Sequence, residues 1–274
     1  MHYEKTKTVI ITGASSGMGF AAAELFSKHG WQVFAGARRL ERMKELKKFG
    51  VETFFLDLSK DDSIETFFRQ VLQKNDDIDV LINNAGYGEY GSLEDTPIEQ
   101  ARAQFQVNVF AAMQLTQLLL PFMRKKHKGR IINISSIAGF LYTPLGGWYD
   151  ATKHALETLT DTLRLETENF GIQAILIEPG GTRSEWLETA LKNARKNTPK
   201  NSIYYSLIDA FDKMFSPMSS KRSSQDLAEL FYQAATVEHP KARYADGFSN
   251  RTVIWAFRHL PYSLTDMVIK KLMK

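Results

Sequence analysis

Short apolar runs alternate with longer amphipathic runs along most of the chain. The apolar runs are rich in β-branched residues, which favour strands that are buried on both faces of a sheet. The predicted strands are residues 8–12, 32–37, 52–56, 80–83, 130–135 and 173–178. The amphipathic runs predict helices near residues 21–29, 40–48, 63–74, 98–126 and 149–170.

Strand–helix alternation of this kind predicts an α/β fold, a doubly wound parallel sheet with helices on both faces. A chain of 274 residues is long enough for one such domain. A helix near residues 224–237 and a short strand at 242–244 would complete it. Ligands of such sheets bind beyond the carboxyl ends of the strands, where the strand order reverses. We therefore expect residues 1–274 to form a single domain with its site at that edge.

The alternation fails in two places near the end of the chain. Residues 184–218 contain polar helical pieces that are interrupted by Pro199 and Pro217. Because this insertion follows the sixth strand, we expect it to lie over the carboxyl edge of the sheet. Residues 252–274 form a second addition, a predicted helical extension at the C-terminus.

A glycine-rich turn follows the first predicted strand and precedes the first helix. Gly13 permits the tight turn, Gly17 lets the backbone approach a pyrophosphate, and Gly19 lets the helix pack closely on the strand. The N–H groups at the start of the helix would bind the phosphates. The sequence therefore predicts a dinucleotide-binding turn, with an ordinary glycine-rich loop as the alternative.

Tyr149 and Lys153 lie four residues apart in a predicted helix, so they project from the same face. A phenol titrates at a pKa near ~10 and is a poor acid–base catalyst at neutral pH unless a neighbouring ammonium stabilises the phenolate. Ser136 lies thirteen residues before the tyrosine. The three residues predict a proton-transfer site, although helices also carry such pairs by chance.

Together with the Gly-x-x-x-Gly-x-Gly spacing and the segment Asn83-Asn84-Ala85-Gly86, this set resembles the short-chain dehydrogenase/reductase family. The resemblance covers roughly residues 6 to 240, and its motifs occur in the expected order. It implies a Rossmann-like NAD(P)-binding domain. It also implies an enzyme that transfers a hydride between a nicotinamide and a carbonyl or secondary alcohol.

The resemblance assigns a role to each expected catalytic residue. Tyr149 donates a proton to the substrate carbonyl in reduction and accepts it in oxidation. Lys153 lowers the pKa of the Tyr149 phenol and holds the nicotinamide ribose. Ser136 donates a hydrogen bond to the substrate oxygen as negative charge develops. Asn108 completes the set by holding a water that links Lys153 to solvent.

The same resemblance places a cofactor site along the strand ends. Its expected residues are Gly13, Ser15, Ser16, Gly17, Met18, Gly19, Arg38, Arg39, Asp57, Leu58, Asn84, Ala85, Gly86, Tyr149, Lys153, Pro179, Gly180 and Thr182. Relatives usually have an apolar residue where Thr182 stands, so this chain departs from the family beside the nicotinamide carboxamide. Asp57 could instead cap the following helix.

The end of the second strand bears on which cofactor is used. A carboxylate there normally binds the adenosine ribose hydroxyls, but this chain has Ala37 at that position and Arg38 directly after it. A guanidinium can bind a phosphate through two parallel hydrogen bonds. The sequence therefore predicts NADP(H). The alternative is that Arg38 and Arg39 are solvated residues at the start of the next helix.

Substrate recognition is predicted from position and from resemblance. In the family, an insertion after the sixth strand forms a substrate lid, so residues 184–218 are expected to act as one; a surface appendage is the alternative. With Ser136 and Tyr149, the expected substrate-binding residues are Tyr142 and Trp186. Aromatic residues favour an apolar pocket, although they are as often core. Local similarity to hydroxysteroid and retinol dehydrogenases also predicts a small, hydrophobic substrate.

The C-terminal extension combines apolar and basic residues. Leu264, Met267, Val268 and Leu272 share one face of a predicted helix, and lysines flank it. Such a helix could lie on a membrane surface. We favour the alternative that it packs on its own domain or on a sister subunit. Relatives commonly form homodimers or homotetramers.

Composition and charge argue against several kinds of site and partner. The net charge of +4 and the scattered basic residues argue against a nucleic-acid partner. The absence of cysteine excludes disulfides and fits a reducing compartment. The histidines are far apart, so no metal site is expected. No run approaches the ~18 apolar residues of a membrane span, and no signal peptide is visible, so we expect a cytoplasmic protein.

Two other functions use the same motifs. A regulatory protein could bind NADP(H) without turnover, but such proteins usually lose the catalytic tyrosine or lysine, and this chain has both. An epimerase or dehydratase acting on a nucleotide sugar would normally have a longer chain with a sugar-binding domain. We therefore expect an NADP(H)-dependent oxidoreductase.

Overall fold

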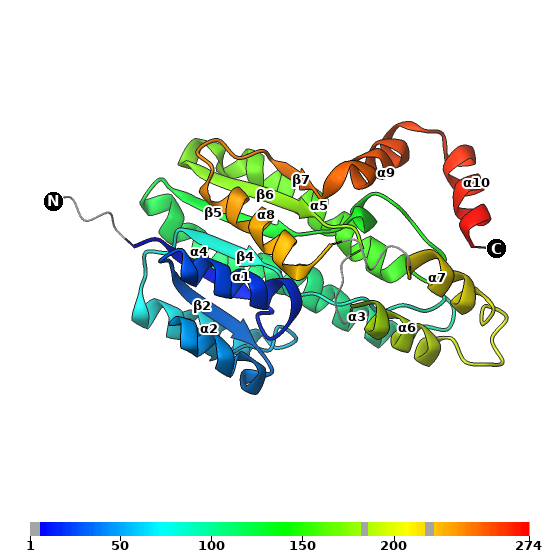
Figure 1. The fold of residues 1–274 in the computed structure, drawn as a ribbon, viewed down its shortest axis with the longest axis horizontal. Coiled ribbons are helices and arrows are strands. Elements are labelled where there is room, and N and C mark those ends of the chain that lie inside the picture. Colours follow the sequence, from blue (N-terminus) through cyan, green and yellow to red (C-terminus); the bar gives the residue numbers. More distant parts are fainter. Residues whose placement is uncertain (1–5, 182–185, 217–221, 274) are drawn as a thin grey trace.

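The computed structural model describes residues 6–181, 186–216 and 222–273. All strands run parallel in one seven-stranded sheet of order β3-β2-β1-β4-β5-β6-β7 (Figure 1). The strands are β1 (Thr8–Thr12), β2 (Gln32–Ala37), β3 (Glu52–Phe55), β4 (Val80–Asn83), β5 (Gly129–Ile134), β6 (Ile172–Glu178) and β7 (Arg243–Ala245). The doubly wound parallel sheet predicted from the sequence is thus confirmed, and the strand order reverses between β1 and β4.

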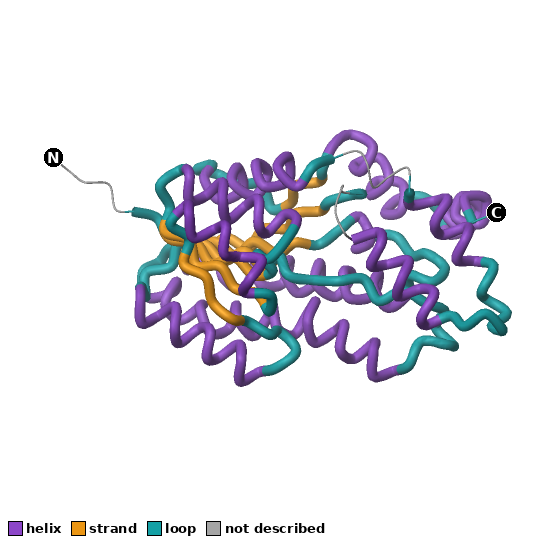
Figure 2. Tube along the Cα trace, turned by 60° about the horizontal axis from the view of Figure 1, so that its bottom comes forward, coloured by secondary structure: helices purple, strands orange, loops and turns teal. Residues whose placement is uncertain are grey.

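Helices cover both faces of this sheet (Figure 2). The α-helices are α1 (Gly17–Lys28), α2 (Asp61–Lys74), α3 (Ile98–Phe105), α4 (Ala111–Lys125), α5 (Gly147–Thr167), α6 (Trp186–Asn197), α7 (Leu207–Phe215), α8 (Ser224–Thr236), α9 (Gly247–His259) and α10 (Tyr262–Leu272). Helical segments of other geometry are the 3₁₀ helices η1 (Leu40–Phe49), η3 (Ile137–Gly139) and η4 (Glu168–Phe170) and the π-helical turn η2 (Gln106–Phe110).

Alternation of side chains along the strands divides the core into two layers. In β1, Val9 and Ile11 are buried with residues of α1 and α8, whereas Ile10 is buried on the other face with residues of α2 and α4. Because both faces are covered, the central residues of β1 and β4 are apolar on both faces, which is the pattern that the sequence displays there. The apolar runs therefore predicted these strands to within one residue.

Two predicted helices differ from the structure. The single helix expected at 98–126 is divided by η2, a π-helical turn that separates α3 from α4. The apolar pattern continues through this turn, so periodicity cannot reveal it, and such turns are often functional. The helix expected at 40–48 is instead the 3₁₀ helix η1.

The additions predicted after the sixth strand lie beyond the carboxyl ends of the strands (Figure 1). The expected lid segment contains α6 and α7, and the C-terminal extension contains α10 and most of α9. Their apolar side chains share one cluster with Tyr149 and Tyr90. None of the helices described by the structure has the length and apolar character needed to cross a membrane.

Candidate active site

The glycine turn between β1 and α1 leaves no room for side chains at two positions. Gly13 has a φ of 72°, which favours glycine, and a Cβ added to it would lie 2.8 Å from the Cα atom of Ala85. A Cβ on Gly19 would lie 2.4 Å from Nδ2 of Asn84 and 2.7 Å from the carbonyl oxygen of Gly13. The turn is thus closed against the segment that follows β4.

Polar contacts join the ends of β1 and β4, where the strand order reverses. The Asn84 side-chain amide donates to the carbonyl oxygen of Thr12 at 2.9 Å. The Thr12 hydroxyl accepts hydrogen bonds from the backbone N–H groups of Asn84 and Ala85, each at 3.1 Å. These contacts place residues 84–86 beside the glycine turn, at the position where sheets of this kind bind their ligands.

Arg39 lies at this turn. Its guanidinium donates to the Ser15 hydroxyl at 3.3 Å and to the Ser16 hydroxyl at 3.0 Å. Ser16 directly precedes α1, and the N–H groups of a helix start favour anions. The closed glycine turn, the helix start and this guanidinium together fit the pyrophosphate and ribose-phosphate end of a dinucleotide.

The sequence argument gave Arg38 the main role in phosphate binding, but the structure places Arg39 on the glycine turn. Arg38 is exposed, and its charge acts on other groups. Burial raises the pKa of Tyr87 to about 12, and the charge of Arg38 opposes this shift. Arg38 also favours the ionised form of Asp57. Both arginines follow the end of β2, and the described hydrogen bonds to the glycine turn come from Arg39.

Other expected cofactor residues serve the fold directly. The Asp57 carboxylate accepts hydrogen bonds from the backbone and hydroxyl of Ser59 at 3.1 and 2.7 Å, so it stabilises the turn before α2. Leu58 is buried in the core. The carbonyl oxygen of Pro179 accepts a bond from Ser136 at 3.3 Å. Thr182 lies outside the described residues.

Tyr149, Lys153 and Ser136 are brought together beyond β5, and both side chains from α5 are almost completely buried. Tyr149 is 6% exposed and Lys153 is 5% exposed. The Lys153 ammonium donates to the carbonyl oxygen of Ile134 at 2.8 Å and lies 5.8 Å from the centre of the Tyr149 ring. The Tyr149 hydroxyl is hydrogen-bonded to Ser136.

Burial shifts the pKa of Tyr149 in the direction opposite to the effect predicted for Lys153, and the effect of Lys153 itself stays a prediction. Burial raises the pKa of Tyr149, a hydrogen bond from Ser136 opposes the shift, and the charge of Asp150 adds to it. Burial also lowers the pKa of Lys153 to about 8, and the charge of Glu157 opposes that shift. Desolvation is the largest contribution to both pKa shifts because both groups lie under the apolar cluster. The hydrogen bond that the structure describes for the Lys153 ammonium is donated to a carbonyl oxygen and not to the Tyr149 hydroxyl.

Asn108 lies in the π-helical turn and holds two segments together. Its side-chain amide donates to the Tyr87 carbonyl oxygen at 3.0 Å and to the Thr152 hydroxyl at 3.1 Å. Its side-chain oxygen accepts from the Tyr87 N–H at 3.1 Å. A Cβ on Gly86 would lie 3.2 Å from that oxygen and 3.6 Å from the Lys153 ammonium. Asn108 is therefore near Lys153, and the water-holding role stays a prediction.

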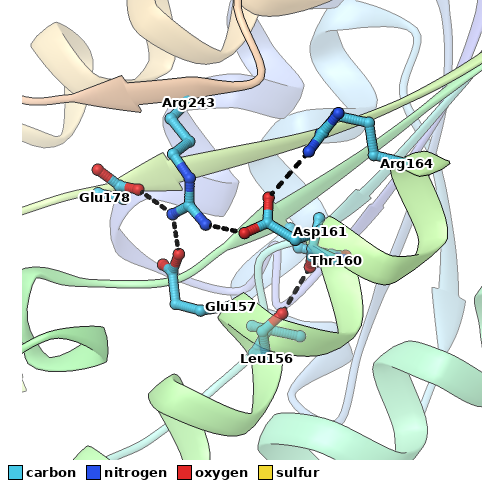
Figure 3. Close-up of polar contacts among 8 residues, drawn as sticks. Leu156, Glu157, Thr160, Asp161, Arg164, Glu178 and Arg243 are labelled. Atoms are coloured by element: carbon cyan, nitrogen blue, oxygen red, sulfur yellow. Dashed lines mark hydrogen bonds and ion pairs between the residues drawn. The ribbon is translucent and has the colours of Figure 1, made fainter.

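A buried ionic cluster lies one helical turn beyond Lys153, and the sequence argument missed it (Figure 3). Arg243 of β7 forms ion pairs with Glu157 and Asp161 of α5 and contacts Glu178 of β6 at 2.7 Å. Burial raises the pKa of Glu157 to about 7, and Glu178 adds to this rise while Arg243 opposes it. The available signal was the i, i+4 spacing from Lys153 to Glu157.

Aromatic side chains cover Tyr149 on its other side. The ring of Tyr90 lies 5.4 Å from that of Tyr149 and 4.8 Å from that of Phe211 in α7. The sequence argument did not identify Tyr90 or Phe211. The Tyr142 hydroxyl contacts Thr265 at 2.9 Å and Asp266 at 2.7 Å, so it binds α10. Trp186 begins α6, and nothing further is described for its side chain.

Comparison with known proteins agrees with this geometry. Residues 7–195 match the short chain dehydrogenase family. The chain belongs to that family. Among members of the family, a probable short-chain type dehydrogenase/reductase, VdlC, from Helicobacter pylori is 36% identical over 95% of this chain and 96% of its own. The NADPH-dependent 3-dehydrocapnine reductase of Ornithobacterium rhinotracheale is 32% identical over 97% of this chain and 96% of its own.

Solved structures of short-chain dehydrogenases have the same architecture. One from Streptomyces avermitilis superposes with a TM-score of 0.81 at 29% identity, over 98% of this chain and 96% of its own. Other similar structures are complexes with NADP or with NAD. The chain is therefore an oxidoreductase of the short-chain dehydrogenase family with the Rossmann-like fold.

Proposed function

We propose that the protein is an NADPH-dependent carbonyl reductase that acts on a hydrophobic ketone. The observation that carries the proposal is the buried Tyr149 hydroxyl, which is bonded to Ser136 and lies beside Lys153, beyond the strand ends and the glycine turn. When bound, the cofactor supplies the hydride. The chain itself must orient the carbonyl, deliver a proton to its oxygen and exclude water.

The proton chemistry starts from the phenol of Tyr149. With an ordinary pKa near ~10 this phenol carries its proton at neutral pH, as a donor to a carbonyl oxygen must, and a neighbouring ammonium would oppose the rise in pKa that burial causes. Ser136 donates a second hydrogen bond to that oxygen as charge develops. Lys153, with its pKa lowered to about 8, can exchange protons near neutral pH and restore the Tyr149 phenol. Asn108 positions the segment beside Lys153.

The cover over Tyr149 supports an apolar substrate. Residues of α6, α7 and α10 form one cluster with Tyr90 and Tyr149, so the side chains packed around Tyr149 are apolar and aromatic. The relative from Ornithobacterium rhinotracheale is named for reduction of 3-dehydrocapnine with NADPH. We propose that α6 and α7 act as the substrate lid and admit a hydrophobic ketone.

The experiment that tests this function is a cofactor-oxidation assay. A panel of aliphatic, steroid-like, retinoid-like and lipid-derived ketones is supplied with NADPH and NADH in parallel, and absorbance at the nicotinamide band is followed. Turnover of apolar ketones with NADPH is the expected result. Binding of NADPH without turnover of any carbonyl or alcohol would instead favour a regulatory protein, the alternative that the retained Tyr149 and Lys153 disfavour.

Replacing either arginine at the end of β2 should change cofactor preference. Arg38→Leu and Arg39→Leu should each weaken NADPH binding by at least about tenfold and NADH binding far less, because a charge-assisted bond to the 2′-phosphate is lost. Dissociation constants for both nucleotides, from fluorescence titration, check this. Arg69→Leu, at an exposed position of α2, is the matched control. Equal weakening of both nucleotides would contradict a role in 2′-phosphate binding.

A further inference from the structure

The C-terminal helices α9 and α10 carry a concentration of exposed apolar side chains. Phe248 is 84% exposed, Met267 is 59% exposed and Trp255 is 55% exposed. We call this set the C-terminal surface. Its exposed apolar residues are Phe248, Trp255, Leu260, Tyr262, Leu264, Met267, Val268 and Leu272. Exposed patches of this kind mark interaction sites.

The helix α10 packs on its own domain with a different face from the one expected. Its buried residues are Thr265 and Ile269, and Met273, which directly follows the helix, is also buried. The apolar face identified from the sequence comprises Leu264, Met267, Val268 and Leu272, and all four are exposed. The helix thus packs on its own domain through another face, and packing of the apolar face on a sister subunit stays a prediction. A partner outside the described chain must cover it, or it faces water.

The charge of the same segment identifies the kind of partner. Residues 247–274 contain five basic residues and one acidic residue, Asp266, so they carry a formal charge of +4. The whole chain also carries +4, so the remainder is neutral overall. The basic residues are Arg251, Arg258, Lys270, Lys271 and Lys274. This segment thus has both an exposed apolar face and a positive charge equal to the net charge of the whole chain. Such a segment complements a surface that is anionic and partly apolar.

We propose that the C-terminal surface docks on an anionic lipid bilayer without crossing it. Leu264, Met267 and Val268 would enter the boundary between headgroups and acyl chains, while Lys270 and Lys271 contact anionic headgroups. Trp255 and Tyr262 are of the residue types that favour this boundary. The proposal concerns the surface to which the protein binds. It does not depend on which reaction the candidate active site catalyses.

A second copy of the chain fits this surface less well. A two-fold contact would bring the same patch of both copies together. Both copies of Lys270 and Lys271 would then lie in one apolar interface, with Asp266 as the single acidic residue of each segment to offset them. Like charges across such a contact are unfavourable. An anionic bilayer instead offers compensation for every basic residue.

The C-terminal surface is continuous with the cover of the catalytic site. On the inner side of α10, Ile269 and Met273 belong to the apolar cluster that contains Tyr149. The Tyr142 hydroxyl, which lies in the loop after β5, bonds to Thr265 and Asp266 of the same helix. A bilayer on the outer side would therefore lie one helix away from the cover of Tyr149.

Vesicle co-sedimentation of the full chain tests the proposal. Vesicles of phosphatidylcholine alone are compared with vesicles that contain phosphatidylglycerol, at low and high salt. We expect binding to the anionic vesicles that weakens with salt. Lys270→Gln/Lys271→Gln should bind about 30-fold more weakly, because each basic residue near the surface contributes about a fivefold factor. Lys47→Gln/Lys48→Gln makes the same charge change on η1 and should bind as the parent does.

A second variant separates the apolar contribution from charge. Met267→Ser should weaken binding by about tenfold through loss of apolar burial, whereas Ile203→Ser, which is 82% exposed and outside the surface, should not. Circular dichroism confirms that each variant is folded. Equal affinity for neutral and anionic vesicles, or no binding to either, would overturn the proposal. So would a Met267→Ser variant that changes oligomeric mass in light scattering and leaves vesicle binding intact.

Discussion

Tyr149→Phe should lower kcat by about a thousandfold, within the 10²–10⁴ range that a positioned general acid supplies. The ring remains in its apolar cluster, so packing against Tyr90 is kept, and only the hydroxyl that is bonded to Ser136 is lost. NADPH binding should remain close to that of the parent, because the glycine turn and Arg39 are untouched. Single-turnover reduction of an active ketone measures the loss.

Tyr90→Phe is the matched control. Its ring lies 5.4 Å from that of Tyr149, so it removes a phenol from the same cluster without removing the proposed acid. We expect it to change kcat far less than Tyr149→Phe does. If Tyr149→Phe reduced ketones at the parent rate, the proton would have another source, and the assignment of the acid would fail.

Arg243→Met should lower the free energy of unfolding by about 3 kcal/mol, because removing one partner of a buried ion pair leaves the other charge unpaired. Arg243 is the cation that joins Glu157, Glu178 and Asp161 across α5, β6 and β7. The expected loss is near the lower end of the range for broken buried ion pairs. The carboxylates left without Arg243 can take up protons, which removes their unpaired charge. Chemical denaturation measures the free energy of unfolding, and Arg69→Met, at an exposed position of α2, is the control.

The same variant should change how stability depends on pH. Burial raises the pKa of Glu157 to about 7 in the folded chain, above its ordinary value of 4.5. The folded state then binds more protons than the unfolded state between these values, so stability falls as pH rises through this window. Without Arg243 the pKa of Glu157 should rise further, and the fall should continue above pH 7. A melting temperature independent of pH from 5 to 8 would contradict this account.

The layered fold could be predicted because its strands are buried on both faces. Uninterrupted apolar runs form the centres of β1, β4 and β5, at residues 9–11, 80–82 and 131–132, and the ends of β1 and β4 coincide with the glycine turn and with Asn83. The pairing of Tyr149 with Lys153 also followed from sequence, because spacing on a helix is a local property, and Ser136 was added to them through the resemblance to the family. These features need no knowledge of long-range packing.

Features that depend on distant contacts could not be predicted. The π-helical turn that contains Asn108 is held by Tyr87 and Thr152, which lie on other segments. Whether Arg38 or Arg39 reaches the glycine turn depends on the path of the chain after β2. The rise in the pKa of Tyr149 arises from desolvation beneath α6, α7 and α10, and a list of neighbours in sequence gives no measure of burial.

The cluster that α6, α7 and α10 form over Tyr149 also affects how tightly substrates bind. If the cluster acts as the proposed lid, a ligand reaches the Tyr149 hydroxyl only in molecules in which these apolar contacts are partly separated. The measured affinity is then the affinity of such open molecules multiplied by the fraction of the protein that is open. Substitutions that loosen the cluster, such as at Phe211, would then tighten apparent binding while leaving every ligand contact unchanged. Ketones that form apolar contacts with the separated side chains would offset the free-energy cost of opening the cluster. They would therefore be favoured over ketones that form fewer such contacts.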